Sequence, residues 1–151
     1  MPAANGATIH ASCVLVGRSA VLIRGASGSG KSRLALALIE AGANGTLPFA
    51  RLVADDRVAL AVAHCRLLAS APDAIKGKIE VRGDGIRELV CEPIALVRLV
   101  VDLDASDSAR MPDTTAREVE ISGVKLSRLP VAPGEDALPA ILAAVAAVTD
   151  A

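Results

Sequence analysis

One segment of the chain has residue types and a spacing that suit the binding of phosphate groups. Residues 25–32 follow the pattern G-x-x-x-x-G-K-S/T and are Gly25, Ala26, Ser27, Gly28, Ser29, Gly30, Lys31 and Ser32. Glycines allow a tight turn whose backbone N–H groups point at phosphate oxygens. The lysine of this pattern reaches the β- and γ-phosphates, and the hydroxyl that follows it binds Mg²⁺. The segment therefore predicts a site for a nucleoside triphosphate with magnesium.

The residues on either side of this segment supply the elements that the pattern needs. The apolar run at 20–23 is typical of a buried strand, and the run at 33–39 has the composition of a helix. The start of a helix adds partial positive charge where phosphates bind. An ordinary turn rich in glycine and serine is the alternative interpretation, and the agreement between pattern and context argues against it.

A phosphate loop needs a carboxylate at the end of a neighbouring strand, where it holds the metal ion or orients a nucleophile. Asp55 and Asp56 follow one short apolar strand, and Asp102 follows another, with Asp104 and Asp107 close behind. Adjacent aspartates repel each other unless a cation or ligand offsets their charge. We therefore predict that Asp55 and Asp56 are the functional pair and that Asp102 lies at a solvated loop entrance. A solvated turn at Asp55 and a site role for Asp102 are the alternatives.

Strand-like and helix-like segments alternate along the chain, which indicates an α/β fold. Strands are expected at residues 7–16, 20–24, 52–54, 58–63, 79–82, 94–103 and within 118–129, and helices at 33–39 and 137–148. The apolar run at 94–103 predicts a central strand, 58–63 is expected to form a hairpin with 52–54, and 105–116 is expected to be a mobile loop. These elements predict one P-loop domain over residues 1–151, with a mixed sheet around the phosphate loop and flanking helices.

The composition limits the classes of partner. Hydrophobic residues make up 52% of the 151 residues, but they are mainly Ala, Val and Leu, and Phe49 is the only aromatic residue. The formal net charge is −1. Nucleic-acid binding needs a basic surface or aromatic side chains on which bases stack. We therefore expect a packed core and no nucleic-acid partner.

The cysteines and the apolar runs indicate the compartment. Cys13, Cys65 and Cys91 are widely spaced and form no C-x-x-C pair, so reduced and partly buried thiols are expected rather than a zinc site. Residues 1–12 lack the basic and apolar regions of a signal peptide. The apolar run at 138–148 is about half as long as a bilayer span. These features predict a soluble cytoplasmic protein without a membrane partner.

Four segments occur in an order that resembles the catalytic domain of the HPr kinase/phosphorylase family. They are His10 before the first strand, the phosphate loop at 25–32, R-L-V-A-D-D-R-V at 51–58 and E-V-R-G-D-G-I at 80–86. The phosphate loop is generic, whereas L-V-A-D-D followed by E-x-R-G-x-G-I is much more specific. The resemblance covers most of the chain, from His10 to the C-terminus. It implies a bacterial enzyme that uses ATP and Mg²⁺ to phosphorylate a serine of the phosphocarrier protein HPr.

The resemblance also implies roles for individual residues. Lys31 and the loop amides would bind the ATP phosphates, with Ser32 and Glu80 near Mg²⁺. Asp55 would be the base that takes the proton of the attacking serine hydroxyl, with Asp56 supporting it. A carboxylate suits this role because phosphoryl transfer is mostly positioning and charge stabilisation.

Two further side chains and a loop are matched to the family in the same way. His10 matches the family's site histidine, and Arg110 is the expected counterpart of its catalytic arginine, which would neutralise charge on the transferring phosphoryl group. A surface histidine and a solvated arginine are the alternatives. Gly83 and Gly85 would let the backbone approach the site, and a plain hairpin turn is the alternative.

The chain departs from the family in two places. Long members carry an N-terminal domain for which this chain has no room, so a short form with only the catalytic domain is expected. Ala132 and Glu135 stand where the family has arginines, in a segment associated with dephosphorylation by phosphate attack. A methyl group and a carboxylate would bind inorganic phosphate poorly. We therefore predict kinase activity with weak or absent phosphorylase activity.

Two other functions stay open on the sequence alone. A small-molecule kinase would share the phosphate loop but would carry an arginine-rich lid, for which the region around Arg110 and Arg117 is a thin candidate. A regulatory module that binds nucleotide without transferring phosphate is the second, and the set formed by Lys31, Asp55, Glu80 and Arg110 argues against it. The sequence does not report the oligomeric state, so a homo-oligomer stays open as well.

Overall fold

The computed structural model describes residues 8–47, 49–81, 83–105 and 117–150 of the protein, with side chains described as far as residue 147. The strands, in chain order, are β1 (Thr8–Ile9), β2 (Ala11–Val16), β3 (Ser19–Arg24), β4 (Ala50–Ala54), β5 (Val58–Ala63), β6 (Arg66–Ser70), β7 (Lys78–Val81), β8 (Gly85–Glu88), β9 (Ala95–Asp102), β10 (Glu118–Ile121) and β11 (Val124–Pro130). The helices are α1 (Lys31–Ala43), the short 3-10 helix η1 (Asp73–Ile75) and α2 (Leu138–Asp150).

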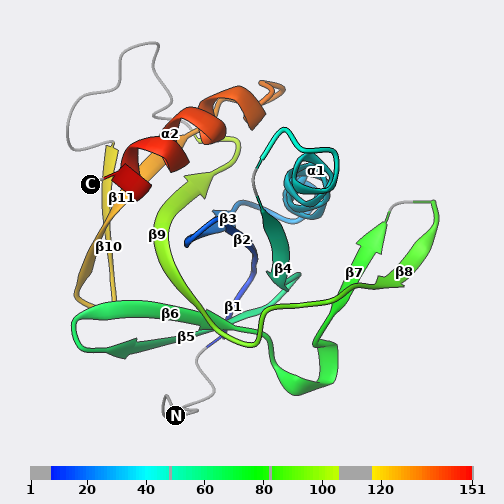
Figure 1. Ribbon diagram of the computed structural model, residues 1–151, viewed down its shortest axis with the longest axis horizontal. Coiled ribbons are helices and arrows are strands. Elements are labelled where there is room, and N and C mark those ends of the chain that lie inside the picture. Colours follow the sequence, from blue (N-terminus) through cyan, green and yellow to red (C-terminus); the bar gives the residue numbers. More distant parts are fainter. Residues whose placement is uncertain (1–7, 48, 82, 106–116, 151) are drawn as a thin grey trace.

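A mixed sheet of nine strands organises the fold, and β7 and β8 form a separate two-stranded sheet. The order in the large sheet is β1-β5-β6-β9-β3-β2-β4, with β11 beside β9 and β10 beside β11. The first residues of β9 pair antiparallel with β6, and its later residues pair in parallel with β3 and β11. Figure 1 shows β9 curving from β6 up toward the helices, so that one central strand joins the two parts of the sheet.

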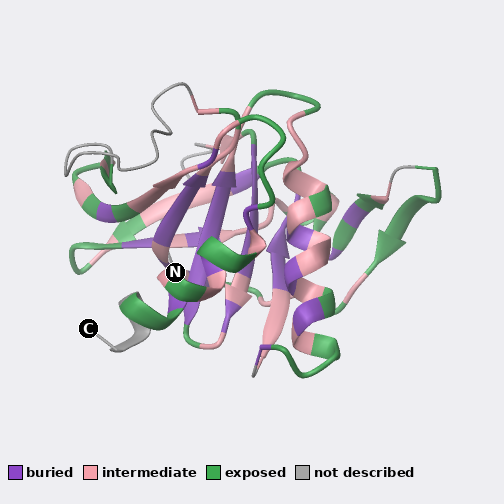
Figure 2. Cartoon of the chain, turned by 90° about the horizontal axis from the view of Figure 1, so that it is seen from above, coloured by how far each residue is buried: buried purple, intermediate pink, exposed green. Residues whose placement is uncertain are grey.

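Alternate residues of β3 pack into two different apolar clusters. Val21 and Ile23 belong to a cluster that includes Ile141 of α2, whereas Leu22 belongs to a second cluster with Leu67 of β6. Both faces of this strand are therefore buried, and the central strands of the sheet are largely purple in Figure 2. Because β3 is fixed on both faces, the start of the segment that follows it is fixed as well.

The structure confirms the α/β fold class and the central strand at 94–103, which is β9. The hairpin expected between 52–54 and 58–63 is wrong, because β4 pairs with β2 while β5 pairs with β1 and β6. The cause lies in the turn between them, where Asp56 has φ of 69° and Arg57 N donates to Asp55 O at 2.8 Å. This turn directs Val58 into the second cluster. The sequence predicts neither β6 nor β8, and residues 106–116 of the expected loop lie outside the described residues.

The exposure of the three cysteines and the character of the helices can be compared with the expectations from the sequence. Cys13 is buried, Cys91 is half-buried and Cys65 is exposed, and all three are free. The expectation of partly buried thiols is thus wrong for Cys65, which lies in the turn between β5 and β6. Across the described ranges, no helix combines the length and the apolar character needed to cross a membrane.

Candidate active site

The glycine-rich segment connects β3 to α1 and leaves the start of the helix open. Gly28 and Gly30 have φ of 83° and 100°, the left-handed region that glycine adopts without strain. Gly30 is the N-cap of α1, and no side chain caps the helix there. The first N–H groups of an α-helix have no partner within the helix. The local sequence thus leaves the start of α1 with free N–H groups, an arrangement that suits the binding of an anion.

Two features of this loop fit a bound phosphate chain. Lys31 Nζ donates to Gly25 O at 2.9 Å and to Ala26 O at 3.0 Å, so the ammonium group lies over the loop. Ser29 Oγ is buried and has no hydrogen-bond partner in the described part of the chain. A Cβ at Gly25 would collide with this same Ser29 Oγ. A methyl group at position 25 would therefore force Ser29 to move, and the loop has polar groups available for phosphate oxygens.

Asp55 lies at the end of β4 and joins four elements. Its carboxylate accepts hydrogen bonds from Ser12 Oγ of β2 at 2.6 Å and from Ser32 Oγ of α1 at 2.8 and 2.9 Å. The backbone N–H of Glu80 on β7 lies 3.5 Å from Asp55 Oδ2. Asp55 is only 3% exposed. Both of its oxygens are thus engaged, and the carboxylate positions the hydroxyl that the sequence assigns to Mg²⁺.

The next residue, Asp56, has the opposite environment. Its side chain is 75% exposed, and its Oδ1 lies 3.9 Å from Nδ1 of His10. Nη2 of Arg57 lies 3.2 Å from Nε2 of the same histidine. The sequence-predicted residues His10 and Asp56 therefore meet at the surface, directly beside the buried Asp55. This carboxylate is open to a substrate approaching from solvent.

Glu80 lies on β7 with an exposed side chain, and its backbone contacts Asp55 as described above. In the part of the chain that the structure describes, no group of three or more His, Cys, Asp or Glu side chains could hold a metal ion by itself. Mg²⁺ in nucleotide sites keeps several waters and is bound by one or two protein groups together with phosphates. The Ser32 hydroxyl and the Glu80 carboxylate are oxygen donors of the kind that such a site uses, and the nucleotide would supply the other ligands.

Asp102 is not at a solvated loop entrance, so that prediction is wrong. Its carboxylate accepts from Arg24 Nε and Nη2 at 2.7 and 2.8 Å and from Arg128 Nε at 2.6 Å. Partial burial by itself would raise the pKa of the Asp102 carboxyl, but the hydrogen bonds and charges of Arg24 and Arg128 hold it below its ordinary value. This ion-pair cluster joins the ends of β3, β9 and β11 immediately before the phosphate loop.

Comparison with known proteins identifies the family. The family described as HPr Serine kinase C-terminal domain matches residues 2–150. The chain belongs to this family. It is 36% identical over 154 residues to the HPr kinase/phosphorylase of Thermoanaerobacter sp. (strain X514), covering 93% of this chain and 48% of that protein. It is 35% identical over 153 residues to the HPr kinase/phosphorylase of Geobacillus thermodenitrificans (strain NG80-2), covering 93% and 47%.

A solved structure agrees with this HPr kinase C-terminal domain in fold. The HPr(Ser) kinase/phosphatase from Coxiella burnetii matches with a TM-score of 0.72 and 25% sequence identity, covering 93% of this chain and 88% of that chain. The chain spans about half the length of the curated relatives it matches.

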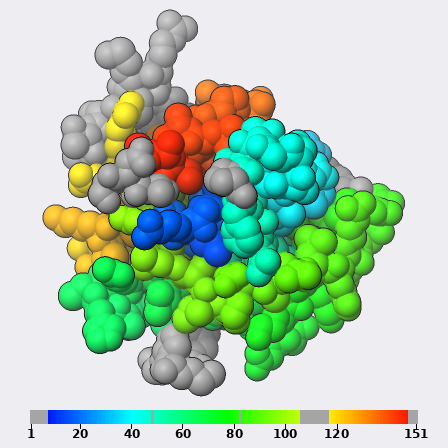
Figure 3. Space-filling model, in the orientation of Figure 1, coloured from blue at the N-terminus to red at the C-terminus, as the bar shows by residue number. Residues whose placement is uncertain are grey.

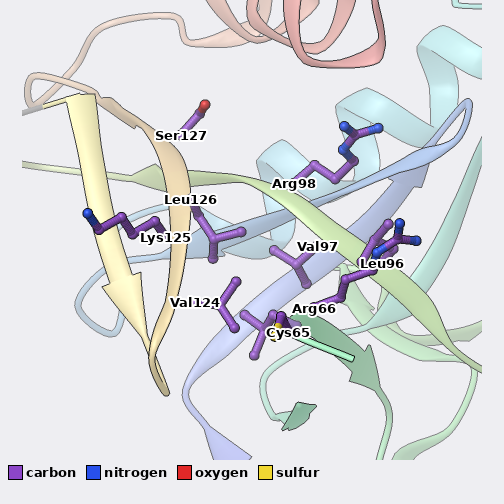
Figure 4. Close-up of a pocket in the computed structure, with 10 residues that line it drawn as sticks. Cys65, Arg66, Leu96, Val97, Arg98, Val124, Lys125, Leu126 and Ser127 are labelled. Carbon is purple, nitrogen blue, oxygen red and sulfur yellow. The ribbon is translucent and has the colours of Figure 1, made fainter. Parts of the chain in front are cut away.

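The structure of this HPr kinase C-terminal domain gathers most, but not all, of the predicted site residues. Arg110 lies outside the described residues. Ser12 was missed; its only signal is a polar residue within the apolar strand at 11–16. A hollow of about 370 Å³ lies between β6, β9 and β11, and Figure 4 shows the side chains around it. The residues that line it include none of the predicted site residues.

Proposed function

We propose that the protein is an ATP-dependent kinase that phosphorylates a serine of the phosphocarrier protein HPr. The observation that carries the proposal is the contact between Asp55 and Ser32 beneath the phosphate loop, with the exposed pair of Asp56 and His10 directly beside it. This arrangement would supply a phosphate site, a place for a metal ion and an accessible carboxylate close together. The names of the relatives supply the acceptor, because they are HPr kinase/phosphorylases.

The geometry of the loop supports the residues that we propose to hold the nucleotide and the metal. The open N-terminus of α1 and Lys31 would bind the phosphates, and Ser32 with Glu80 would contribute to Mg²⁺ binding. Bound Mg²⁺ would neutralise charge on the phosphates during transfer. Asp55 would keep the Ser32 hydroxyl oriented, because it already accepts hydrogen bonds from Ser32 Oγ in the protein alone.

The exposure of the two aspartates is our reason for assigning the catalytic base to Asp56. A general base must come within hydrogen-bond distance of the proton that it removes. Asp55 is buried and already accepts hydrogen bonds from Ser12 and Ser32, whereas Asp56 is open to solvent. The family resemblance implies instead that Asp55 is the base and that Asp56 supports it. On our proposal Asp56 accepts the proton of the acceptor serine as its oxygen attacks phosphorus, and His10 helps to place the Asp56 carboxylate.

The proposal also covers the phosphorylase activity, the role of Arg110 and the partners of the protein. The turn at Ala132 carries a carboxylate, because Glu135 Oε2 accepts from Ala132 N at 3.3 Å. Negative charge here opposes the binding of inorganic phosphate, so we propose weak or absent phosphorylase activity.

We also propose that Arg110 neutralises charge on the transferring phosphoryl group. Residues 1–151 would act as one cytoplasmic catalytic domain with HPr as its partner, without nucleic-acid or membrane partners, and the domain could assemble as a homo-oligomer.

Transfer of labelled phosphate from ATP and Mg²⁺ to HPr tests this function. We expect label on a serine of HPr, and we expect Lys31→Ala to abolish its transfer. Arg33→Ala is the matched control, since Arg33 lies in the same helix turn with an exposed side chain, and it should transfer at close to the wild-type rate. Tight nucleotide binding without labelling of HPr would contradict the proposed function. Release of phosphate or, with inorganic phosphate present, of pyrophosphate from phosphoserine-HPr at a rate near the kinase rate would contradict the proposed weak phosphorylase activity.

A further inference from the structure

The hairpin of β7 and β8 stands apart from the large sheet and lies next to the site. It projects beside α1 in Figure 1, and in the space-filling view its green surface lies below the cyan surface of α1 (Figure 3). Ile79 anchors it in the first core cluster and is 1% exposed. Leu89 N donates to Gly77 O at 2.7 Å and closes its base. The hairpin is thus fixed at its base, while every residue of β8 is exposed.

The register of this hairpin places an apolar side chain beside Glu80. Ile86 of β8 is the direct cross-strand partner of Glu80 of β7. Side chains of directly opposed residues lie on the same face of a sheet, with Cβ atoms about 5 Å apart. The backbone of Glu80 in turn contacts the carboxylate of Asp55. Ile86 is 69% exposed, so an open aliphatic side chain lies beside Glu80, one strand away from the contact between Glu80 and Asp55.

We infer that Ile86 is a specificity-determining contact for the acceptor protein, against which an apolar side chain near the acceptor serine packs. The inference rests on the proposed function, since it takes Glu80 and Asp55 as parts of the transfer site. An apolar side chain cannot hydrogen-bond to phosphates, and the loop and α1 would bind those. The acceptor hydroxyl, in contrast, must approach the face that carries the carboxylates. Beside Asp56 lie His10 and, next to it, Arg57, which are both polar, so on this proposal Ile86 supplies the apolar part of that approach.

The contribution of such a contact is measurable as a change in acceptor affinity. A few well-buried apolar contacts dominate the energetics of protein interfaces, and removal of one costs roughly a tenfold loss of affinity or more. The salt bridge between Arg87 and Asp84 at 3.0 Å spans the turn of the hairpin. A substitution of the exposed Ile86 leaves this ion pair and the anchoring Ile79 intact, so the hairpin should keep its shape.

The test is steady-state transfer to HPr by Ile86→Ser, with Val62→Ser as the matched control. Val62 is also an exposed aliphatic residue on a strand, 46% exposed on β5, but it does not pair with a site residue. We expect Ile86→Ser to raise the KM for HPr about tenfold, with kcat, the affinity for ATP analogues and Tm close to wild type. Val62→Ser should leave all four unchanged, and Ile86→Leu should restore a KM close to wild type.

Three results would overturn the inference. The first is an active Ile86→Ser enzyme with the wild-type KM for HPr. The second is an equal rise in KM for Val62→Ser. The third is dissociation of an oligomer by Ile86→Ser in sedimentation velocity, which would assign the face to a second copy of the chain. Each of these three results can be obtained with an active wild-type kinase. Failure of the wild type to label HPr would instead overturn the proposed function and this inference together.

Discussion

The ion-pair cluster of Asp102 with Arg24 and Arg128 should contribute measurably to stability. The substitution Asp102→Asn removes a carboxylate that accepts three hydrogen bonds of 2.6 to 2.8 Å. Breaking a fully buried pair costs about 3–5 kcal/mol because a charge is left without a partner. Arg24 is 32% exposed and Asp102 is 15% exposed, so water offsets part of this loss. We expect a loss of about 2 kcal/mol in the free energy of unfolding.

Chemical denaturation and thermal unfolding monitored by circular dichroism give this number directly. For a chain of this size, a loss of about 2 kcal/mol lowers Tm by about 4–8 °C. Glu92→Gln is the matched control, because Glu92 accepts only one hydrogen bond of 3.3 Å from Arg51 and both side chains are more exposed. The control should lose less than about 1 kcal/mol. Equal losses for the two variants, or no loss for Asp102→Asn, would refute the reasoning.

The dependence on pH provides a second check on the same cluster. The pKa of Asp102 lies below its ordinary value of 3.8 in the folded protein, so the unfolded chain binds this proton more readily. The stabilisation is therefore fully present above the ordinary pKa, and it is lost as the pH falls through the folded-state pKa. The difference in unfolding free energy between the wild type and Asp102→Asn should be constant from pH 7 to pH 5 and should shrink below pH 4. A difference that grows in acid would contradict the assignment.

Two further predictions concern the thiols and the phosphate loop. Burial raises the pKa of the Cys13 thiol to about 12, so at pH 8 an alkylating reagent should label Cys65 within minutes and Cys13 only on unfolding; equal rates by mass spectrometry would be inconsistent with this structure. Gly25→Ala should weaken the binding of a fluorescent ATP analogue, because the new methyl group collides with Ser29 Oγ and forces it to move, while Gly45→Ala, which strains a backbone with φ of 86° outside the loop, should bind normally. Binding by Gly25→Ala at the wild-type affinity would contradict the expectation that the position of Ser29 matters for nucleotide binding.

The local parts of the site are those that the sequence could predict. The phosphate loop depends on eight consecutive residues, and its glycine conformations follow from residue type alone. Asp55 and Asp56 were found together because adjacent carboxylates at a strand end are unusual. Their separate environments were not predictable, since the burial of Asp55 depends on Ser12 of a different strand. Adjacent residues can thus differ completely in exposure, and only the turn at Asp56 shows which one faces solvent.

Interactions between residues far apart in the sequence account for the wrong predictions for Asp102 and for the partner of β5. The cluster around Asp102 brings together Arg24 and Arg128, which are 78 and 26 residues away in sequence. No local pattern links the three, so Asp102 resembled an ordinary loop residue. The strand β5 was assigned to the wrong partner for a similar reason, because a hairpin with its neighbour β4 is the local solution. The second apolar cluster, which contains Val58 and Leu67, instead places β5 beside β6.

The division of roles between the two aspartates gives the most direct test of the proposed phosphoryl transfer. Single-turnover transfer to HPr and the affinity for ATP with Mg²⁺ should be measured for Asp56→Asn and Asp55→Asn. We expect Asp56→Asn to lower the transfer rate by about a hundredfold or more with nucleotide affinity unchanged, because it removes the base. Asp55→Asn should weaken the Mg²⁺-dependent binding of ATP, because it releases Ser32. Transfer by Asp56→Asn at the wild-type rate would contradict the assignment of the base, and a wild type that labels no serine of HPr would contradict the function itself.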